Sequence, residues 1–265
     1  VAVGTCALSG AALETGSGEL GGLQAFLLGR TESGSQDLNA DGITDGMDLA
    51  ALRQKAAQEQ EIQDGYTGFI RTQGKLLVDE DGKQYIIKGM AFGNEVWSNP
   101  STPPTLHHNA ESYQELAEMG FDSVRFYLNY GMFESDSDPY TYREEGFQWL
   151  DTNIAWAKAA GIRLVLNMHY PEGGYQSQGN GTALWTEPEN QKRLSALWQA
   201  IAQRYADEPV ILGYGLVNEP VVAASDGTAA LKLWQSVAQE LTDSIRTVDQ
   251  NHMIFVERML SLIHI

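Results

Sequence analysis

The feature that most restricts the fold of this chain is a regular alternation of short apolar runs with amphipathic stretches, which begins after residue 60. Five apolar runs have the length of a buried strand, and they lie at about 84–91, 122–128, 163–169, 210–217 and 252–257. The stretches between them predict helices at roughly 109–119, 145–160, 188–206 and 228–247. The runs are continuously apolar rather than alternating, which is typical of parallel strands covered on both faces. The pattern therefore predicts an α/β fold with a parallel sheet, either a barrel or a doubly wound sheet.

Spacing within the predicted helices supports this interpretation. Two helices carry apolar stripes at intervals of three and four residues, formed by Leu194, Leu197, Ile201 and Tyr205 in one and by Trp234, Val237, Leu241 and Ile245 in the other. Gly120 and Gly161 follow two further helices at the position where a left-handed cap is preferred. No Gly-x-Gly-x-x-Gly motif follows the first strand, which disfavours a dinucleotide-binding sheet.

The chain before residue 60 has a different character, with two short helical stretches separated by an Asp/Gly-rich loop. We assign residues 1–57 to a small all-α module, 58–66 to a polar connector and 67–265 to the α/β domain. Residues 69–88 predict a small hairpin at the start of that domain, because Gln73-Gly74 and Asp81-Gly82 are turn signals.

Composition excludes several classes of partner. The formal net charge is −18, from 17 Lys+Arg against 35 Asp+Glu, whereas nucleic-acid binding needs clustered basic residues. No apolar run reaches the roughly 18 residues of a membrane span. Cys6 is the only cysteine, so no intrachain disulfide forms. No initiator Met or signal peptide precedes Val1, so we expect the native N-terminus to lie elsewhere.

The Asp/Gly-rich loop at residues 37–48 fits a twelve-residue calcium loop. Oxygen donors stand at its positions 1, 3, 5, 9 and 12, a backbone carbonyl is available at position 7, and the turn glycine is at position 6. The predicted ligands are Asp37, Asn39, Asp41, Ile43, Asp45 and Asp48. Calcium is a hard cation that needs this many oxygens, so the loop predicts a structural calcium site. The alternative is a solvated, Asp-rich turn.

Asp48 stands where an EF-hand has Glu, and a single predicted helix follows it. Both features resemble a dockerin, the module that binds cohesins on a cellulosome scaffold. The match is specific for residues 36–55. Dockerins carry two such repeats, and residues 19–28 match the helix of the other one, but residues 8–19 lack its Asp/Asn ligands. The resemblance implies a cohesin partner. We expect either that the first repeat has lost calcium or that the first residues are not native sequence.

Asn218-Glu219-Pro220 follows the apolar run 210–217, which places Glu219 at the carboxyl end of a parallel strand, where barrel enzymes keep their chemistry. Cleavage of a glycoside needs one carboxylic acid to protonate the leaving oxygen and a second carboxylate to act on the anomeric carbon. Glu219 is the candidate acid, and Asn218 could bond a sugar hydroxyl. The alternative is an ordinary turn after a strand.

Two more polar residues lie in predicted strands. Arg125 places a permanent charge in a strand otherwise suited to burial, and it needs carboxylate partners because an unpaired buried charge is costly. His169 ends the following strand. The alternatives are a structural ion pair for Arg125 and a satisfied core histidine for His169.

Together, Arg125, His169 and Asn218-Glu219-Pro220 resemble glycoside hydrolase family 5 over residues 67–259. The resemblance implies a (β/α)8 TIM barrel and a retaining mechanism with Glu219 as the acid/base. Asn218, Arg125 and His169 would then support the nucleophile and the −1 sugar, without a catalytic cofactor. Aromatic residues on the loops could stack on sugars, and the candidates are Trp97, Tyr127, Tyr170 and Trp185.

The chain departs from this pattern after the fifth strand. The family's nucleophile is a glutamate that ends strand seven, whereas here strand five, at 253–258, is followed by Ile265 as the last residue. We therefore expect only about strands one to five, no nucleophile in the chain, and an isolated fragment that is unstable or inactive. Glu257 also ends a strand, but the resemblance gives a strand-five glutamate no nucleophilic role.

These features predict an extracellular, cellulosome-associated endo-β-1,4-glucanase that acts on plant cell-wall polysaccharide. A β-mannanase or xylanase is the nearest alternative, because loops decide the choice of substrate. An alternative of another class is an inactive fragment that binds cohesin through the calcium loop and glycan through its aromatic residues. A barrel enzyme with unrelated chemistry is a third possibility, because fold does not fix function.

Overall fold

The computed structural model describes residues 68–96 and 108–259. The chain divides into two units, residues 1–64 and 65–265, and every described residue belongs to the second. The predicted calcium loop at 37–48, the rest of the dockerin-like module, the connector at 58–66 and Trp97 lie outside the described residues.

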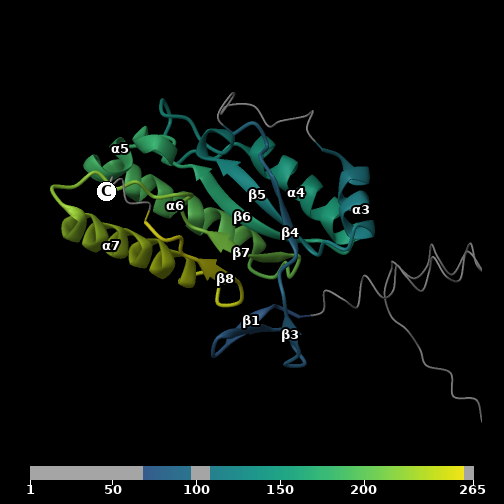
Figure 1. Cartoon of the computed structure of the whole chain (residues 1–265). Helices are drawn as coiled ribbons and strands as arrows, with labels where there is room; N and C mark the ends of the chain where they lie inside the picture. The colour runs from purple at the N-terminus through teal and green to yellow at the C-terminus, as the bar shows by residue number, and fades with distance from the viewer. Residues whose placement is uncertain (1–67, 97–107, 260–265) are drawn as a thin grey trace, which may run out of the picture. The chain divides into compact units, whose positions relative to one another are not determined.

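Five parallel strands form the main sheet, in the order β4-β5-β6-β7-β8 (Figure 1). Their bounds are β4 Gly89–Phe92, β5 Ser123–Asn129, β6 Arg163–Tyr170, β7 Ile211–Gly215 and β8 Met253–Phe255. Each strand pairs with its neighbours in the sequence, as expected for successive units of a (β/α) barrel. A doubly wound sheet would reverse its strand order at one point, and this sheet does not.

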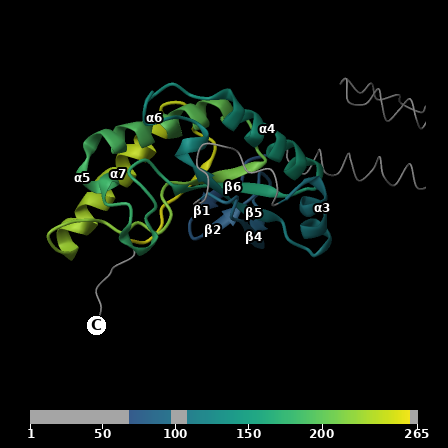
Figure 2. The ribbon, with the colours of Figure 1, turned by 90° about the horizontal axis from the view of Figure 1, so that it is seen from above.

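The helices lie along one face of the sheet, as the view from above shows (Figure 2). Their bounds are α3 Ala110–Glu118, α4 Glu144–Ala159, α5 Ala183–Thr186, α6 Pro188–Tyr205 and α7 Gly227–Arg246, with 3-10 turns η1 Tyr130–Met132 and η2 Ser177–Gly179. The four helices predicted from spacing are confirmed to within one residue at each end. Local signals set these ends: Asn109 and Asp226 cap α3 and α7 with their side chains. Gly120 and Gly161 follow α3 and α4 with positive φ of 84° and 72°.

The two faces of the sheet differ. Side chains that point toward the helices are fully buried, and they include Val124, Phe126, Leu128, Leu164, Leu166 and Met168. The opposite face lines a hollow of about 670 Å³, and Met90 on the edge strand β4 is 50% exposed. The expectation that both faces are covered is therefore wrong for the described part of the chain. The runs look continuously apolar because the second face carries small or apolar residues such as Ala91, Val165 and Gly215 between its polar ones.

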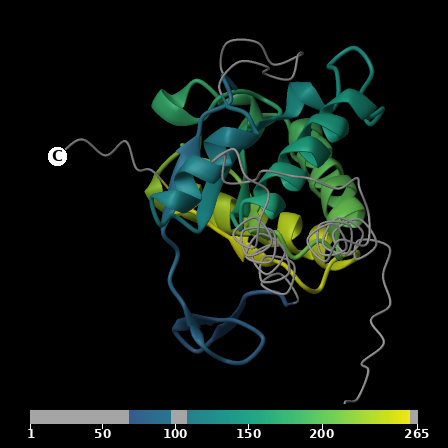
Figure 3. The same ribbon diagram turned by 90° about the vertical axis from the view of Figure 1, so that its right-hand side faces the viewer.

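A small antiparallel sheet precedes the parallel one, and it is formed by β1 Arg71–Gln73, β2 Leu76–Val78 and β3 Gln84–Tyr85 (Figure 3). Its two turns fall at Gly74 and Gly82, which confirms the turn signals. Ile70 and Leu77 pack against Leu212 and Met253, so this sheet contacts β7 and β8 of the parallel one.

The predicted strand at 84–91 is wrong as one element. Gln84 and Tyr85 pair with β2, whereas the first barrel strand begins at Gly89 and pairs with Ser123. A Cβ at Gly89 would come within 2.8 Å of the Ser123 hydroxyl, so a glycine permits this close pairing.

Candidate active site

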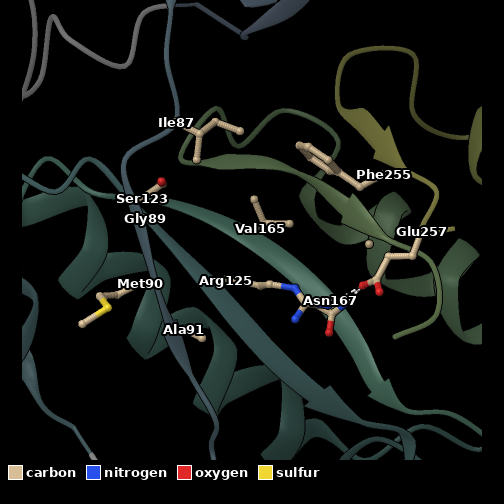
Figure 4. Close-up of a pocket in the computed structure, with 11 residues that line it drawn as sticks. Ile87, Gly89, Met90, Ala91, Ser123, Arg125, Val165, Asn167, Phe255 and Glu257 are labelled. Carbon is tan, nitrogen blue, oxygen red and sulfur yellow. Dashed lines mark hydrogen bonds and ion pairs between the residues drawn. The ribbon is translucent and has the colours of Figure 1, made fainter. Parts of the chain in front are cut away.

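Polar side chains from four adjacent strands meet at the carboxyl ends of the parallel sheet. Arg125 comes from β5, Asn167 from β6, Asn218 from the segment after β7, and Glu257 from the segment after β8. Arg125, Asn167 and Glu257 point toward one another at one end of the hollow, and apolar residues line its other end (Figure 4). Parallel pairing brings the same ends of successive strands together, and Arg125, which stands level with Val165 in the sheet, reaches these ends through its long side chain.

Arg125 and Glu257 form the ion pair at its centre. The Nη2 of Arg125 donates to Asn218 Oδ1 over 2.8 Å and also to Glu257 Oε1, while its Nη1 donates to the Tyr127 hydroxyl over 3.3 Å. The two charged side chains are 35% and 28% exposed. The prediction that Arg125 needs a carboxylate partner is confirmed, and the partner is Glu257.

Glu257 is held by further donors. Asn167 Nδ2 donates to its Oε1 over 3.4 Å, and the indole N–H of Trp234 donates to its backbone carbonyl over 3.0 Å. The Asn167 side chain passes close to β7, where a Cβ on Gly215 would lie only 2.8 Å from its Nδ2. A glycine at that position therefore leaves space for the amide that reaches Glu257.

Glu219 lies just beyond β7 with its side chain exposed. Its backbone φ is 43°, in the left-handed region that residues other than glycine seldom adopt. Its N–H donates to Glu257 Oε2 over 2.9 Å, and its Oε2 accepts a hydrogen bond from the Ser177 hydroxyl. Asn218, the preceding residue, is 1% exposed and fixed by Arg125. The exposed carboxyl of Glu219 thus projects from a backbone that buried neighbours hold in place.

His169 packs behind this cluster. Its ring stacks on Tyr127, with the ring centroids 3.8 Å apart and the planes 12° from parallel, and its Nδ1 lies 3.2 Å from Asn167 Oδ1. Burial, and to a smaller extent the positive charge of Arg125, lower the pKa of His169 from an ordinary 6.5 to about 4. The imidazole is therefore neutral at neutral pH.

The aromatic residues expected to stack on sugars differ in their surroundings. Tyr127 lies within β5 rather than on a loop, and Tyr170 ends β6, with its ring 6.0 Å from that of Tyr175. Trp185 is 5% exposed, donates its indole N–H to Gln176 and meets Trp234 edge to face. The expectation of a loop aromatic that offers its face to a sugar is therefore wrong for Trp185, because these contacts bury the ring.

Asn167 and Ser177 contact the cluster, although neither was expected there from the sequence. Asn167 stands two residues before His169 in the same strand, so the period of two could have placed both on one face. Ser177 lies in an irregular loop, and no sequence signal marks it.

The arrangement can support proton transfer to a bound molecule. Glu257 is surrounded by donors, whereas Glu219 is an exposed carboxyl at the rim of the same cluster, within reach of solvent. Among residues 68–96 and 108–259, no group of three or more His, Cys, Asp or Glu could hold a metal ion. Within the same residues, none of the helices has both the length and the apolarity to cross a membrane.

Known proteins resemble the chain over the same region. The family described as Cellulase (glycosyl hydrolase family 5) matches residues 78–259. Endoglucanase C of Acetivibrio thermocellus is 31% identical over 143 residues, which are 54% of this chain and 40% of that protein. An endoglucanase of Paenibacillus polymyxa is 30% identical over 207 residues, with 72% of this chain and 50% of that protein covered.

Solved structures support the fold. Endo-glycoceramidase II from Rhodococcus sp., in a complex with a cellobiose-like isofagomine, superposes with a TM-score of 0.60 at 22% identity, over 70% of this chain and 52% of that one. The chain spans about half or less of the length of these relatives. The match to the family covers more than half of the residues printed here, and it includes Arg125, His169 and Glu219. This chain belongs to glycosyl hydrolase family 5.

Proposed function

We propose that the protein hydrolyses β-1,4-glucosidic bonds of plant cell-wall polysaccharide by a retaining two-carboxylate mechanism. The observation that carries this proposal is Glu219, an exposed carboxyl at the end of β7 whose backbone is fixed to the Arg125–Glu257 cluster. Family membership and the endoglucanase names of several relatives support glucan as the substrate.

Glu219 acts first as the general acid in this mechanism. It gives its proton to the glycosidic oxygen as the bond to the anomeric carbon breaks, and it later takes a proton from the water that releases the sugar. Asn218 and Arg125 belong to the same cluster, and the hydrogen bond between them holds the amide of Asn218 in place. His169 supports the site as a neutral, stacked ring.

The nucleophile of this mechanism is none of the described carboxylates. Glu257 is the nearest alternative, because it ends β8 beside Glu219. In the family that the chain resembles, a glutamate that ends the fifth strand is not the nucleophile, and here the two oxygens of Glu257 accept from Arg125, Asn167 and the N–H of Glu219. We assign to Glu257 the role of orienting Arg125 and the backbone of Glu219.

The test is release of reducing ends from soluble β-1,4-glucan by the complete protein that carries this sequence, beside its Glu219→Gln variant. Loss of general acid catalysis should lower turnover by roughly 10²- to 10⁴-fold. Glu240→Gln, an exposed change on α7, is the matched control and should retain full activity. Parallel assays on β-mannan and xylan decide between the substrate alternatives. Equal turnover by wild type and Glu219→Gln would contradict the assignment.

The calcium and cohesin functions remain proposals of their own, supported by the donor pattern at residues 37–48. They would attach the enzyme to an extracellular cellulosome. Calorimetric titration with Ca²⁺ should show binding that is lost in Asp37→Ala/Asp41→Ala, and chelation should abolish capture by a cohesin. Cohesin capture that persists in that variant would contradict the proposed dependence on calcium.

A further inference from the structure

The loop that joins β6 to α5 is built around Gln176, whose side chain is fully buried. Its Nε2 donates to the carbonyls of Gly174 and Gly181 over 2.9 and 2.8 Å, and its Oε1 accepts from the indole N–H of Trp185 over 2.7 Å. One amide therefore joins the two ends of the loop to each other and to α5.

Two glycines let this loop pack against itself and against α5. Gly173 has a φ of 84°, and a Cβ there would lie 2.2 Å from the backbone nitrogen of Leu184. A Cβ at Gly181 would lie 2.0 Å from Gln176 Nε2. These approaches leave no space for a larger residue at either position, so glycine is required for this close packing of the loop.

Ser177 follows Gln176 and is placed by it. The residue is 7% exposed, and its hydroxyl contacts both members of the Asn218-Glu219 pair. Asn218 Nδ2 lies 3.4 Å from the Ser177 oxygen and can only donate. The one hydrogen of the hydroxyl is thus directed to Oε2 of Glu219.

This hydrogen bond distinguishes the two oxygens of Glu219. Oε2 accepts from Ser177, and among the described residues Oε1 has no hydrogen-bond partner. A proton on Oε2 would compete with the hydrogen of Ser177, whereas a proton on Oε1 leaves that hydrogen bond intact. Oε2 can accept from Ser177 in both protonation states of the carboxyl, provided that Oε1 is the oxygen that gains and loses the proton.

We propose that Ser177 is a positioning residue that fixes Glu219 through Oε2 and assigns proton transfer to Oε1. The inference rests on the proposed role of Glu219 as the acid/base. In the first half of the reaction the proton leaves Oε1 for the glycosidic oxygen as the C–O bond breaks and the second carboxylate of the proposed mechanism bonds to the anomeric carbon. In the second half, water loses a proton to Oε1 as its oxygen bonds to the anomeric carbon and the bond from that carbon to the second carboxylate breaks. The hydrogen of Ser177 stays on its own oxygen throughout.

The kinetic test compares Ser177→Ala and Ser177→Thr in the complete protein, with two classes of leaving group. A hydrogen bond to a charged group corresponds to roughly 10- to 100-fold in rate. We expect Ser177→Ala to lose about that factor in kcat/KM for an alkyl or sugar leaving group, and much less for a nitrophenyl group, which needs little protonation. Ser177→Thr keeps the hydroxyl and should restore most of the rate. Equal losses for both leaving groups would overturn the proposal, because a general structural defect affects both.

A second measurement does not depend on turnover. In ¹³C-labelled chain, the side-chain carboxyl signal of Glu219 is assigned by its disappearance in Glu219→Gln. At constant pH this signal should shift in Ser177→Ala and stay in place in Ser137→Ala, an exposed serine bonded to Ser135 on another loop. An unchanged signal in Ser177→Ala overturns the inference. If the wild type hydrolyses no glycan while the signal shifts as expected, the proposed function fails and the contact from Ser177 to Glu219 stands.

Discussion

The backbone N–H of Glu219 donates to the Oε2 of Glu257 over 2.9 Å, so the carboxylate after β8 holds the backbone after β7. Glu219 is in the left-handed region with a φ of 43°, where a side chain costs conformational energy. Glu257 therefore helps to maintain the backbone geometry of the proposed acid.

Because of this backbone geometry, we expect two substitutions that remove the Glu219 carboxyl to differ in their effect on stability. Glu219→Ala and Glu219→Gly both remove the carboxyl and its contact with Ser177, but only glycine adopts a positive φ without strain. We expect Glu219→Gly to be more stable than Glu219→Ala by about 1 kcal/mol, after its larger unfolded-state entropy is included. Urea denaturation of both variants measures the difference, and a more stable alanine variant would show that the backbone is not strained there.

Removal of Glu257 should destabilise the domain. Glu257→Ala leaves Arg125 without its carboxylate and the Glu219 N–H without its acceptor. Because both charged groups are about one-third exposed, water compensates in part, and we expect a loss of about 1 kcal/mol in the free energy of unfolding. Glu257→Gln keeps an acceptor oxygen and should lose less. Glu240→Ala on the surface of α7 is the control, and a stability of Glu257→Ala equal to this control would rule out the proposed support.

Because of the buried carboxyl of Glu172, we expect the folded domain to become less stable as the pH rises. The Glu172 side chain is fully buried and lies near the carboxylate of Glu134. Burial, together with the nearby negative charge of Glu134, raises the pKa of Glu172 well above its ordinary value of 4.5, against the opposing effects of a backbone hydrogen bond and of the Arg193 charge. The folded state thus binds the proton more tightly than the unfolded state. Stability is complete below pH 4.5 and is lost as the pH rises toward the folded-state pKa.

The variant Glu172→Gln removes this titration while keeping the shape of the side chain. Its free energy of unfolding should depend less on pH above 4.5 than that of the wild type, so that the variant is relatively more stable at alkaline pH. Urea midpoints for both proteins at a series of pH values provide the comparison. Parallel curves would show that Glu172 is not held neutral.

For His169 we expect the opposite: the folded domain should become less stable as the pH falls. Its pKa is about 4 in the folded state against an ordinary 6.5, first because of burial and second because of Arg125. The unfolded chain therefore binds the proton more readily, and stability is lost as the pH falls from 6.5 to 4. The loss is at most about 3.5 kcal/mol, since one pKa unit corresponds to about 1.4 kcal/mol. His169→Gln should show a smaller loss over this window in the same urea titration, and an identical loss would assign acid sensitivity to other groups.

Local patterns predicted much of the fold. Gly120 and Gly161 marked the ends of α3 and α4. The starts of α3 and α7 coincide with Asn109 and Asp226, whose side chains accept from backbone N–H groups within three residues along the chain. Apolar spacing identified α6, whose residues Leu194, Leu197 and Ile201 are fully buried. The split of 84–91 was not predictable in this way, because pairing with β2 or with β5 decides where each part belongs.

The site was also predictable only in part, because contacts between segments far apart in the sequence decide much of it. Arg125 could be identified because a charged residue is unusual within an apolar strand. Asn218 and Glu219 could be identified because they directly follow one. The partner of Arg125 is 132 residues away in sequence, and the contact from Ser177 to Glu219 depends on a loop fixed by Gln176 and Trp185. Such contacts follow from packing between distant segments, which spacing within one segment does not encode.

The order of strands in the sheet also has a consequence for folding. Each strand pairs with the one that precedes it, so β4 to β7 can associate as the chain leaves the ribosome, with short loop closures at each step. Glu257 follows the last of the five strands and is therefore the last part of the cluster to arrive. Until β8 pairs with β7, the Arg125 guanidinium lacks its carboxylate and must remain hydrated. Docking of β8 is thus the step that supplies the carboxylate partner of Arg125 and the acceptor for the Glu219 N–H.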